Sequence, residues 1–136
     1  MVEMHSTNYQ GTLILISPDS KAIAGCVPPK PESIAGRQYR VIIDSPYQLS
    51  SDDVVFGVFA DRQNIGEALR AEARKVFFSK GQPCLRSSAL VKTYGWGVHF
   101  DTRGFVALVG RETEEYQHLL SDDGVKKIEG MRSKRT

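Results

Sequence analysis

Apolar and polar residues alternate most clearly in the stretch YGWGVHFDTRGFVALVG at 94–110. One face of a strand there would carry three large apolar side chains, Trp96, Val98 and Phe100. The other face would carry small or polar residues, namely Gly95, Gly97, His99 and Asp101. A turn from Asp101 to Gly104, with glycine in a left-handed conformation, leads to the partner strand FVALVG. The pattern therefore predicts an antiparallel hairpin over 94–110.

A second strand is predicted at 12–17, where TLILIS is apolar throughout and so belongs in the interior of a sheet. A further strand is compatible with 85–91. We expect an α+β fold with a small, mainly antiparallel sheet formed by the 12–17 strand and the 94–110 hairpin. Four to five helices should pack on it and cover one face. The 136 residues predict a single domain over 1–136.

Helical spacing of apolar residues appears in several segments. Ser33 is the expected N-cap of a helix over 33–44, with Pro46 just beyond its end. Ser50 and Asp53 form a capping box that favours a helix over 50–63, although Gly57 and the β-branched valines oppose it. Helices are also expected at 112–120 and at 122–131.

The helix expected between 64 and 80 has the most regular pattern. Asn64 is its predicted N-cap, and Lys80 with Gly81 marks its end. One side is apolar and should face the body of the protein, through Ile65, Leu69, Ala73, Val76 and Phe77.

Composition narrows the class of protein. The net charge of +2 is too small to attract nucleic acid or membranes by charge alone. The longest early apolar run, LILI, is too short for a signal peptide or a membrane span. Two cysteines without close spacing do not form a disulfide framework, so we expect a cytoplasmic protein with reduced thiols. Met4 offers a second start codon.

The segment PDSKAIAGCVPPKPES at 18–33 holds four of the six prolines. Its Pro28-Pro29-Lys30-Pro31 portion must be extended, because the proline ring fixes φ and restricts the preceding residue. The segment is either a loop that wraps around the body or a proline-rich ligand for another protein's domain.

The two glycines beside Trp96 suggest that something approaches the strand closely on their face. The approaching group is either a crossing helix or a ligand lying on the sheet. In the second case His99 and Asp101 stand at the edge of the ligand site. The carboxylate of Asp101 would then fix the tautomer of the imidazole.

Cys84 follows a helix end in FFSKGQPCLR and lies between Lys80 and Arg86 in the sequence. Neighbouring cations favour the thiolate, so a catalytic relay of Cys84, His99 and Asp101 is one hypothesis. The alternative is an inert thiol that packs against Leu85.

Basic residues near the hairpin suggest an anion site for a phosphate or carboxylate, with Ser87 and Ser88 as further donors. The residues expected to bind such a ligand are Lys80, Arg86, Lys92, Tyr94, Gly95, Trp96 and Gly97. Arg103 also falls in this region, and all these cations could equally be solvated. We predict no metal site, because His5, His99 and Cys84 have no recognised ligand spacing. The basic tail at 124–136 lacks interleaved aromatic residues, which argues against nucleic-acid binding.

Several blocks of the chain resemble a family of small, mostly bacterial proteins known as domain of unknown function 6157. They are HSTNYQGTLI at 5–14, VPP at 27–29, PYQLSSDDVVF at 46–56, FFSKGQPCLRSSALVKTYGWGVHFD at 77–101, VALVG at 106–110 and MRSKR at 131–135. The similarity runs from about Met4 to the end, and Cys26 departs from the family pattern. The resemblance implies no activity, cofactor or catalytic residue. It places the family signature on His5, Asn8, Tyr9, Ser51, Asp52, Asp53, Lys80, Gly81, Cys84, Arg86, Lys92, Tyr94, Gly95, Trp96, Gly97 and His99.

Three functions therefore stay open. The first, which we favour, is a binding module for a small anionic molecule on the sheet face around Gly95 and Gly97. The second is an enzyme of unknown reaction that uses Cys84 or His99. The third is a protein-interaction domain that uses the proline loop or a sheet edge. Cofactor and oligomeric state are not indicated by the sequence.

Overall fold

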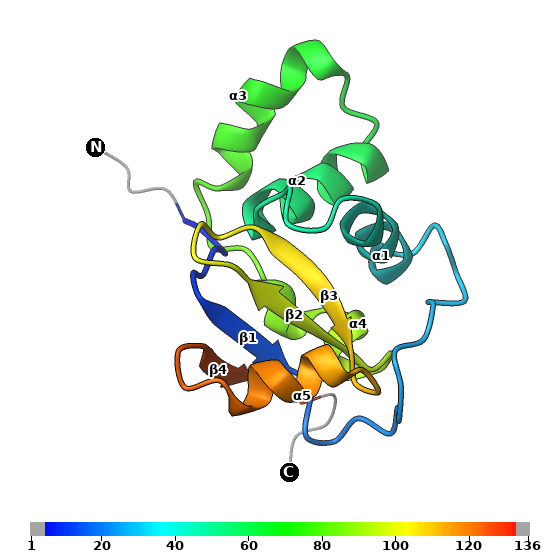
Figure 1. Ribbon diagram of the computed structural model, residues 1–136. Helices are drawn as coiled ribbons and strands as arrows, with labels where there is room; N and C mark the ends of the chain where they lie inside the picture. Colours follow the sequence, from blue (N-terminus) through cyan, green and yellow to red (C-terminus); the bar gives the residue numbers. More distant parts are fainter. Residues whose placement is uncertain (1–4, 133–136) are drawn as a thin grey trace.

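The computed structural model describes residues 5–132, so Met4 lies outside the described part. The fold is α+β, with five α-helices and a four-stranded sheet in residues 5–132 (Figure 1). The elements in chain order are β1 (Thr12–Leu15), α1 (Ile34–Asp44), α2 (Ser51–Arg62), α3 (Glu67–Phe77), the short 3₁₀ turn η1 (Leu85–Ser87), α4 (Ala89–Lys92), β2 (Trp96–Phe100), β3 (Val106–Gly110), α5 (Glu114–Ser121) and β4 (Lys126–Glu129).

The sheet has the strand order β3-β2-β1-β4. β2 pairs antiparallel with both β1 and β3, whereas β4 pairs parallel with β1. The predicted hairpin is confirmed, and Gly104 has the expected left-handed φ of 90°. Asp101 closes its turn, because its Oδ1 accepts hydrogen bonds from the backbone N–H groups of Arg103 and Phe105, each at 2.9 Å.

Two secondary-structure predictions are wrong. The segment 122–131 contains strand β4 instead of a helix, with Ile128 in register with Ile14 of β1. Without β4 the backbone groups on that edge of β1 would have no partners, so pairing outweighs the local charge pattern. The segment 85–91 forms η1 and the start of α4 instead of a strand. Ser88 begins the helix, since its Oγ accepts the N–H of Leu90 at 3.1 Å.

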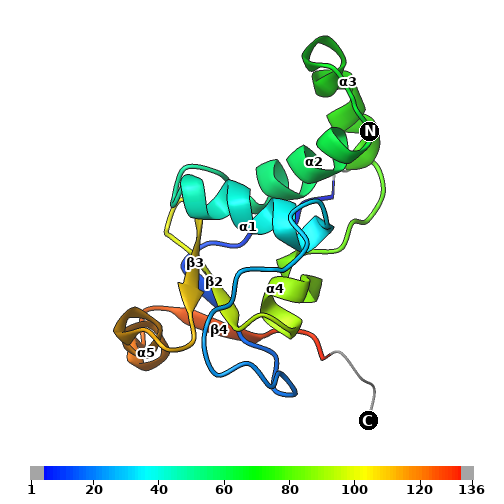
Figure 2. The same ribbon diagram turned by 90° about the vertical axis from the view of Figure 1, so that its right-hand side faces the viewer.

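Helices cover both faces of the sheet, so the prediction of one covered face is also wrong. Figure 2 shows the sheet nearly edge-on, with α5 on one side and α4 on the other. The larger core lies on the α4 side, and its fully buried residues are Ile14, Ile42, Val54, Leu85, Val91, Val98, Phe100 and Val106. On the opposite face α5 packs Tyr116 against Leu13, Ile16 and Val109. The inward placement of Val98 and Phe100 is thus confirmed.

Two of the three predicted N-caps are confirmed. Ser33 caps α1 by accepting the N–H of Gly36, and Ser50 with Asp53 forms the capping box of α2. The predicted start of α3 is wrong, because Gly66 is its N-cap and Asn64 has a positive φ of 55°. α3 also ends earlier than predicted, at Phe77.

The predicted burial of the apolar side of α3 is only partly correct. No residue of α3 is buried, and Leu69 and Val76 expose 66% and 64% of their surface. Figure 1 shows α3 projecting from the body of the molecule. Ile65, Ala73 and Phe77 are partly buried and pack against the cluster of Phe56, Ala60 and Phe78.

Candidate functional site

The hollow expected beside Gly95 and Gly97 is filled by the protein itself. A Cβ atom at Gly97 would lie 2.7 Å from Cε2 of Tyr116, so α5 covers this face of β2. A Cβ atom at Gly95, whose φ is 78°, would lie 2.3 Å from the carbonyl oxygen of Ala24. Of the two interpretations of the glycines, close packing is therefore correct and a ligand on the sheet is not.

The proline-rich segment wraps around the body of the protein. The Trp96 Nε1–H donates to the carbonyl oxygen of Cys26 at 2.8 Å, and the indole ring also packs against Gly25. The ring of Tyr39 on α1 lies 5.6 Å from that of Trp96. Trp96 is thus held between α1 and the wrapping segment, and its outer edge is only half-buried.

The structure does not assemble the relay of Cys84, His99 and Asp101. Cys84 precedes η1 on the α1 and α2 side of the sheet, whereas His99 shares the face of β2 that carries Gly97. The Nδ1 atom of His99 is hydrogen-bonded to the hydroxyl of Tyr47 at 2.8 Å. Asp101 is engaged by the turn that it closes.

Tyr47 and His99 form a half-buried pair beside the start of α5. Burial, together with the smaller influence of the charges of Glu115 and Asp101, raises the pKa of Tyr47 to about 12. Burial lowers the pKa of His99, against the opposing influence of Glu115, Asp101 and Asp122. Both groups are therefore neutral at neutral pH, and a single hydrogen bond joins the hydroxyl of Tyr47 to Nδ1 of His99. Tyr47 has a φ of 58°, which is unusual for a residue other than glycine.

We expect Tyr47 to make the stability of the protein fall in alkaline solution. The unfolded chain has the ordinary tyrosine pKa of about 10, whereas the folded chain has a pKa of about 12. The stabilising contribution of neutral Tyr47 is therefore complete below the unfolded value and is lost as the pH rises between the two. Thermal unfolding measured across this pH range should show that the melting temperature falls less steeply with pH in Tyr47→Phe than in the parent. The control is Tyr94→Phe, and an equal slope in parent and Tyr47→Phe would contradict the prediction.

The basic residues expected to gather around an anion lie on different elements. Lys80 is exposed after α3, and Lys92 ends α4. Arg86 donates through Nε to the carbonyl oxygen of Glu129 on β4 at 2.8 Å. Arg103 lies over the ring of Phe105 in the hairpin turn. Tyr94 contributes its carbonyl oxygen, which accepts the N–H of Cys26.

A pocket of about 420 Å³ lies instead between the helices, and we call it the α1–α2 pocket. Its walls come from α1, α2, the end of α3 and the chain at 82–89. Figure 2 shows this last segment descending from α3 to α4 past α2. The lining is mostly apolar and consists of Ile34, Ala35, Gln38, Val55, Val58, Phe59, Arg62, Phe77, Gln82, Pro83, Cys84, Ser87, Ser88 and Ala89.

Gln38 gives the α1–α2 pocket a fixed polar group. Only 7% of its surface is exposed, and its Oε1 accepts the hydroxyl of Ser88 at 2.6 Å. Its amide nitrogen has no hydrogen-bond partner among the described residues. Every fully buried side-chain nitrogen or oxygen in residues 5–132 has a hydrogen-bond partner. This nitrogen has none, so it is not fully buried and borders open space. Since Gln38 lines the pocket, we infer that the amide nitrogen faces it.

Cys84 is half-buried at the wall of the same pocket. The hydroxyl of Ser87 donates to its carbonyl oxygen at 2.8 Å and so holds the local turn. Tyr9 lies beside both Cys84 and Arg86. Burial raises the pKa of Tyr9 and Cys84 adds to this, whereas Arg86 lowers it.

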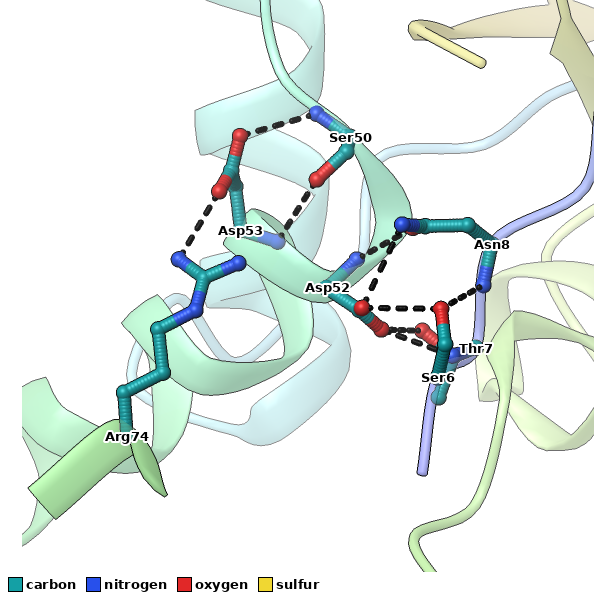
Figure 3. A network of polar contacts seen from close by, with 7 residues as sticks. All are labelled: Ser6, Thr7, Asn8, Ser50, Asp52, Asp53 and Arg74. Atoms are coloured by element: carbon teal, nitrogen blue, oxygen red, sulfur yellow. Dashed lines mark hydrogen bonds and ion pairs between the residues drawn. The ribbon is translucent and has the colours of Figure 1, made fainter. Parts of the chain in front are cut away.

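Asp52 fastens the N-terminal segment to the first turn of α2, as Figure 3 shows. Its Oδ1 accepts the N–H and the hydroxyl of Thr7 at 2.7 and 2.8 Å, and its Oδ2 accepts the hydroxyl of Ser6 at 2.9 Å. Asn8 donates to Oδ2 at 3.2 Å and accepts the N–H of Asp52 at 2.9 Å. His5 continues the attachment, since its Nε2 lies 3.1 Å from the carbonyl oxygen of Gln82 at the pocket wall.

Asp53 has a separate partner on α3, also drawn in Figure 3. Its carboxylate accepts the N–H of Ser50 at 3.0 Å and pairs with Arg74 at 2.8 Å. Burial alone would raise the pKa of Asp53, but these hydrogen bonds outweigh it and the pKa is lowered. This ion pair and the one between Arg70 and Asp61 at 2.9 Å link α2 to the projecting helix.

Cys84, Ser87 and Ser88 were predicted as site residues from the sequence, but most of the lining of the α1–α2 pocket was not, above all Gln38 and Arg62. One signal was present in α2, where VVFGVF places apolar residues on more than one side of the helix. Val54 belongs to the core, whereas Val55 and Phe59 line the pocket. A helix that is apolar on several sides is in contact with something on each of them.

None of the helices in residues 5–132 has both the length and the apolar character needed to cross a bilayer. Within the same range, no three His, Cys, Asp or Glu side chains gather closely enough to hold a metal ion.

A sequence model described as "Family of unknown function (DUF6157)" matches residues 4–136. No curated protein matches the chain, and no solved structure matches it. The functional inference therefore depends on the geometry of the chain itself.

Proposed function

We propose that this chain, which belongs to the family of unknown function DUF6157, binds a small molecule in the α1–α2 pocket. The ligand would have an apolar body and an anionic end. The observation that carries the proposal is a mostly apolar pocket of about 420 Å³ with one free, fixed donor on its wall. A pocket of this size and composition is typical of small-molecule sites.

The apolar lining favours a ligand that buries hydrocarbon or aromatic surface. Val55 and Phe59 of α2 line the pocket together with Pro83 and Ala89, and transfer of apolar surface from water would be the main source of affinity there. The amide nitrogen of Gln38 would donate to a carbonyl or carboxylate oxygen of the ligand. A buried donor of this kind orients the ligand, because leaving it unpaired costs free energy.

Arg62 supports an anionic end of the ligand. It ends α2, lines the pocket and is exposed. No hydrogen bond or ion pair within residues 5–132 engages its guanidinium group, so it is free to pair with a carboxylate or sulfonate at the rim. The anionic ligand predicted from the sequence is thus retained, but at a different place.

The proposal is tested by the fluorescence of anilinonaphthalene sulfonate, which combines an aromatic body with an anionic group. We expect one saturable site on the folded protein, with the dye displaced by decanoate. Ala89→Phe, which fills the pocket with a ring, should weaken dye binding on the order of tenfold or more. The matched control is Ala71→Phe on the exposed side of α3, which should bind as the parent does.

A second pair of variants tests the anionic end. Arg62→Gln should weaken dye binding by roughly three- to tenfold, because one charge-assisted contact is lost. Arg103→Gln, in the hairpin turn, is the matched control. Dye binding that is unchanged in Ala89→Phe would refute the pocket as the site, whereas an effect equal in the two arginine variants would refute only the anionic end.

The remaining inferences about setting are part of the same proposal. Cys26 and Cys84 are free thiols, which fits a reducing compartment such as a bacterial cytoplasm. We also propose that the chain is one domain, because α1 and α2 line the pocket and also pack on the sheet.

A further inference from the structure

Cys84 and Gln38 both line the α1–α2 pocket, and their side chains have complementary chemistry. Cys84 brings a half-buried thiol, which is a nucleophile. Gln38 brings an unpaired amide donor on a residue that exposes only 7% of its surface. Ser88 holds the other end of that amide at 2.6 Å, so the direction of the donor is fixed. An electrophile that also carries a hydrogen-bond acceptor would use both groups.

We propose that the α1–α2 pocket takes α,β-unsaturated carbonyl compounds with an apolar body and that Cys84 adds to them covalently. This inference rests on the proposed binding function and names its ligand class. The apolar walls formed by Val55, Phe59 and Pro83 would bind the body of the ligand. The carbonyl oxygen would accept the free N–H of Gln38, and the β-carbon would lie toward Sγ of Cys84.

The addition needs no oxidant or reductant. The S–H bond of Cys84 breaks and its proton goes to water, while Sγ forms a bond to the β-carbon of the ligand. The π electrons of the carbon–carbon double bond move to give an enolate, whose oxygen is stabilised by the amide of Gln38. The α-carbon then takes a proton from water, and the product is a thioether with a saturated carbonyl group.

The environment of the thiol supports this role. Tyr9 lies beside both Cys84 and Arg86, and Cys84 is half-buried at the pocket wall. Cys26, by contrast, is exposed on the wrapping segment and does not line the pocket.

Cys26 therefore serves as an internal control in one protein. The probe is chalcone, an apolar enone, and each thiol is followed by peptide mass spectrometry at neutral pH. The rate at each cysteine is divided by its rate with iodoacetamide, which is small and does not need the pocket. We expect this normalised rate to be on the order of tenfold or more higher at Cys84 than at Cys26. Excess dihydrochalcone, the saturated analogue, should slow chalcone addition at Cys84 and leave Cys26 unaffected.

A variant isolates the contribution of the amide. Gln38→Leu should lower the chalcone rate at Cys84 roughly tenfold or more while leaving the iodoacetamide rate unchanged. Equal normalised rates at the two cysteines in the parent would overturn the inference even if Gln38→Leu does not fold. If chalcone shows no preference while the dye still binds in the pocket, this inference fails alone. If the dye does not bind either, the proposed function fails with it.

Discussion

Asp52→Ala is expected to lower the free energy of unfolding by about 2–4 kcal/mol. The carboxylate accepts four hydrogen bonds from residues 6–8, and Thr7, its main partner, exposes only 3% of its surface. Alanine would remove the carboxylate oxygen that accepts both the buried N–H and the hydroxyl of Thr7. A buried donor left unpaired costs more free energy than its hydrogen bond contributed. We therefore expect a large loss of stability from this single substitution. Urea unfolding followed by circular dichroism measures it.

Asp61→Ala on the same helix is the matched control. Asp61 pairs with Arg70 at 2.9 Å, but 47% of its side chain is exposed. Exposed ion pairs contribute little, so its loss should stay within about 1 kcal/mol. Amide hydrogen exchange of residues 5–9 gives a second readout, since only Asp52→Ala should release them. Equal losses in the two variants would contradict the attachment role of Asp52.

The capping box of α2 could be predicted from the sequence, but the contacts of Asp52 could not. Ser50 and Asp53 are three positions apart, so the geometry of one helical turn brings them together. Asp52 meets Thr7 across a sequence separation of 45 residues. Nothing in the local pattern specifies that pairing, because the arrangement depends on where the N-terminal segment crosses α2.

The same distinction explains the secondary-structure errors. Strand β4 depends on the free edge of β1, which lies more than a hundred positions earlier in the chain, and local charge spacing at 122–131 indicated a helix instead. α3 has the expected amphipathic pattern, yet it projects from the body and leaves Leu69 exposed. Periodicity predicts which side of a helix is apolar, but it does not say whether another element covers that side.

For the candidate site, the sequence identified Cys84 and the unusual glycines but could not say what surrounds each. The register of β2 puts His99 on the face covered by α5, away from Cys84 and the α1–α2 pocket. Gln38 and Arg62 come from two different helices, and only the packing of α1 against α2 brings them to one cavity. Such convergence is a property of the tertiary structure.

Gly95→Ala is expected to destabilise the protein by about 3–5 kcal/mol, through two additive causes. The φ of 78° is costly for any residue with a Cβ atom, and that atom would stand 2.3 Å from the carbonyl oxygen of Ala24. Backbone cannot yield as a flexible side chain does, so the wrapping segment would have to move away. Its contacts with Trp96 would be lost at the same time, including the 2.8 Å hydrogen bond to Cys26. Thermal unfolding measures the loss, and the fluorescence of the single tryptophan should shift to longer wavelength.

Gly57→Ala provides the matched control, because the same methyl group at this position in α2 would meet nothing within 4 Å. Alanine is the better helix former, so this variant should be as stable as the parent or gain about 0.5–1 kcal/mol. The two variants together distinguish a glycine that packing requires from one that it does not. At Gly95 a side chain is excluded by packed backbone, whereas at Gly57 the space is open. A Gly95→Ala protein as stable as Gly57→Ala would mean that the wrapping segment does not lie against the hairpin. The assignment of that glycine to packing would then be wrong.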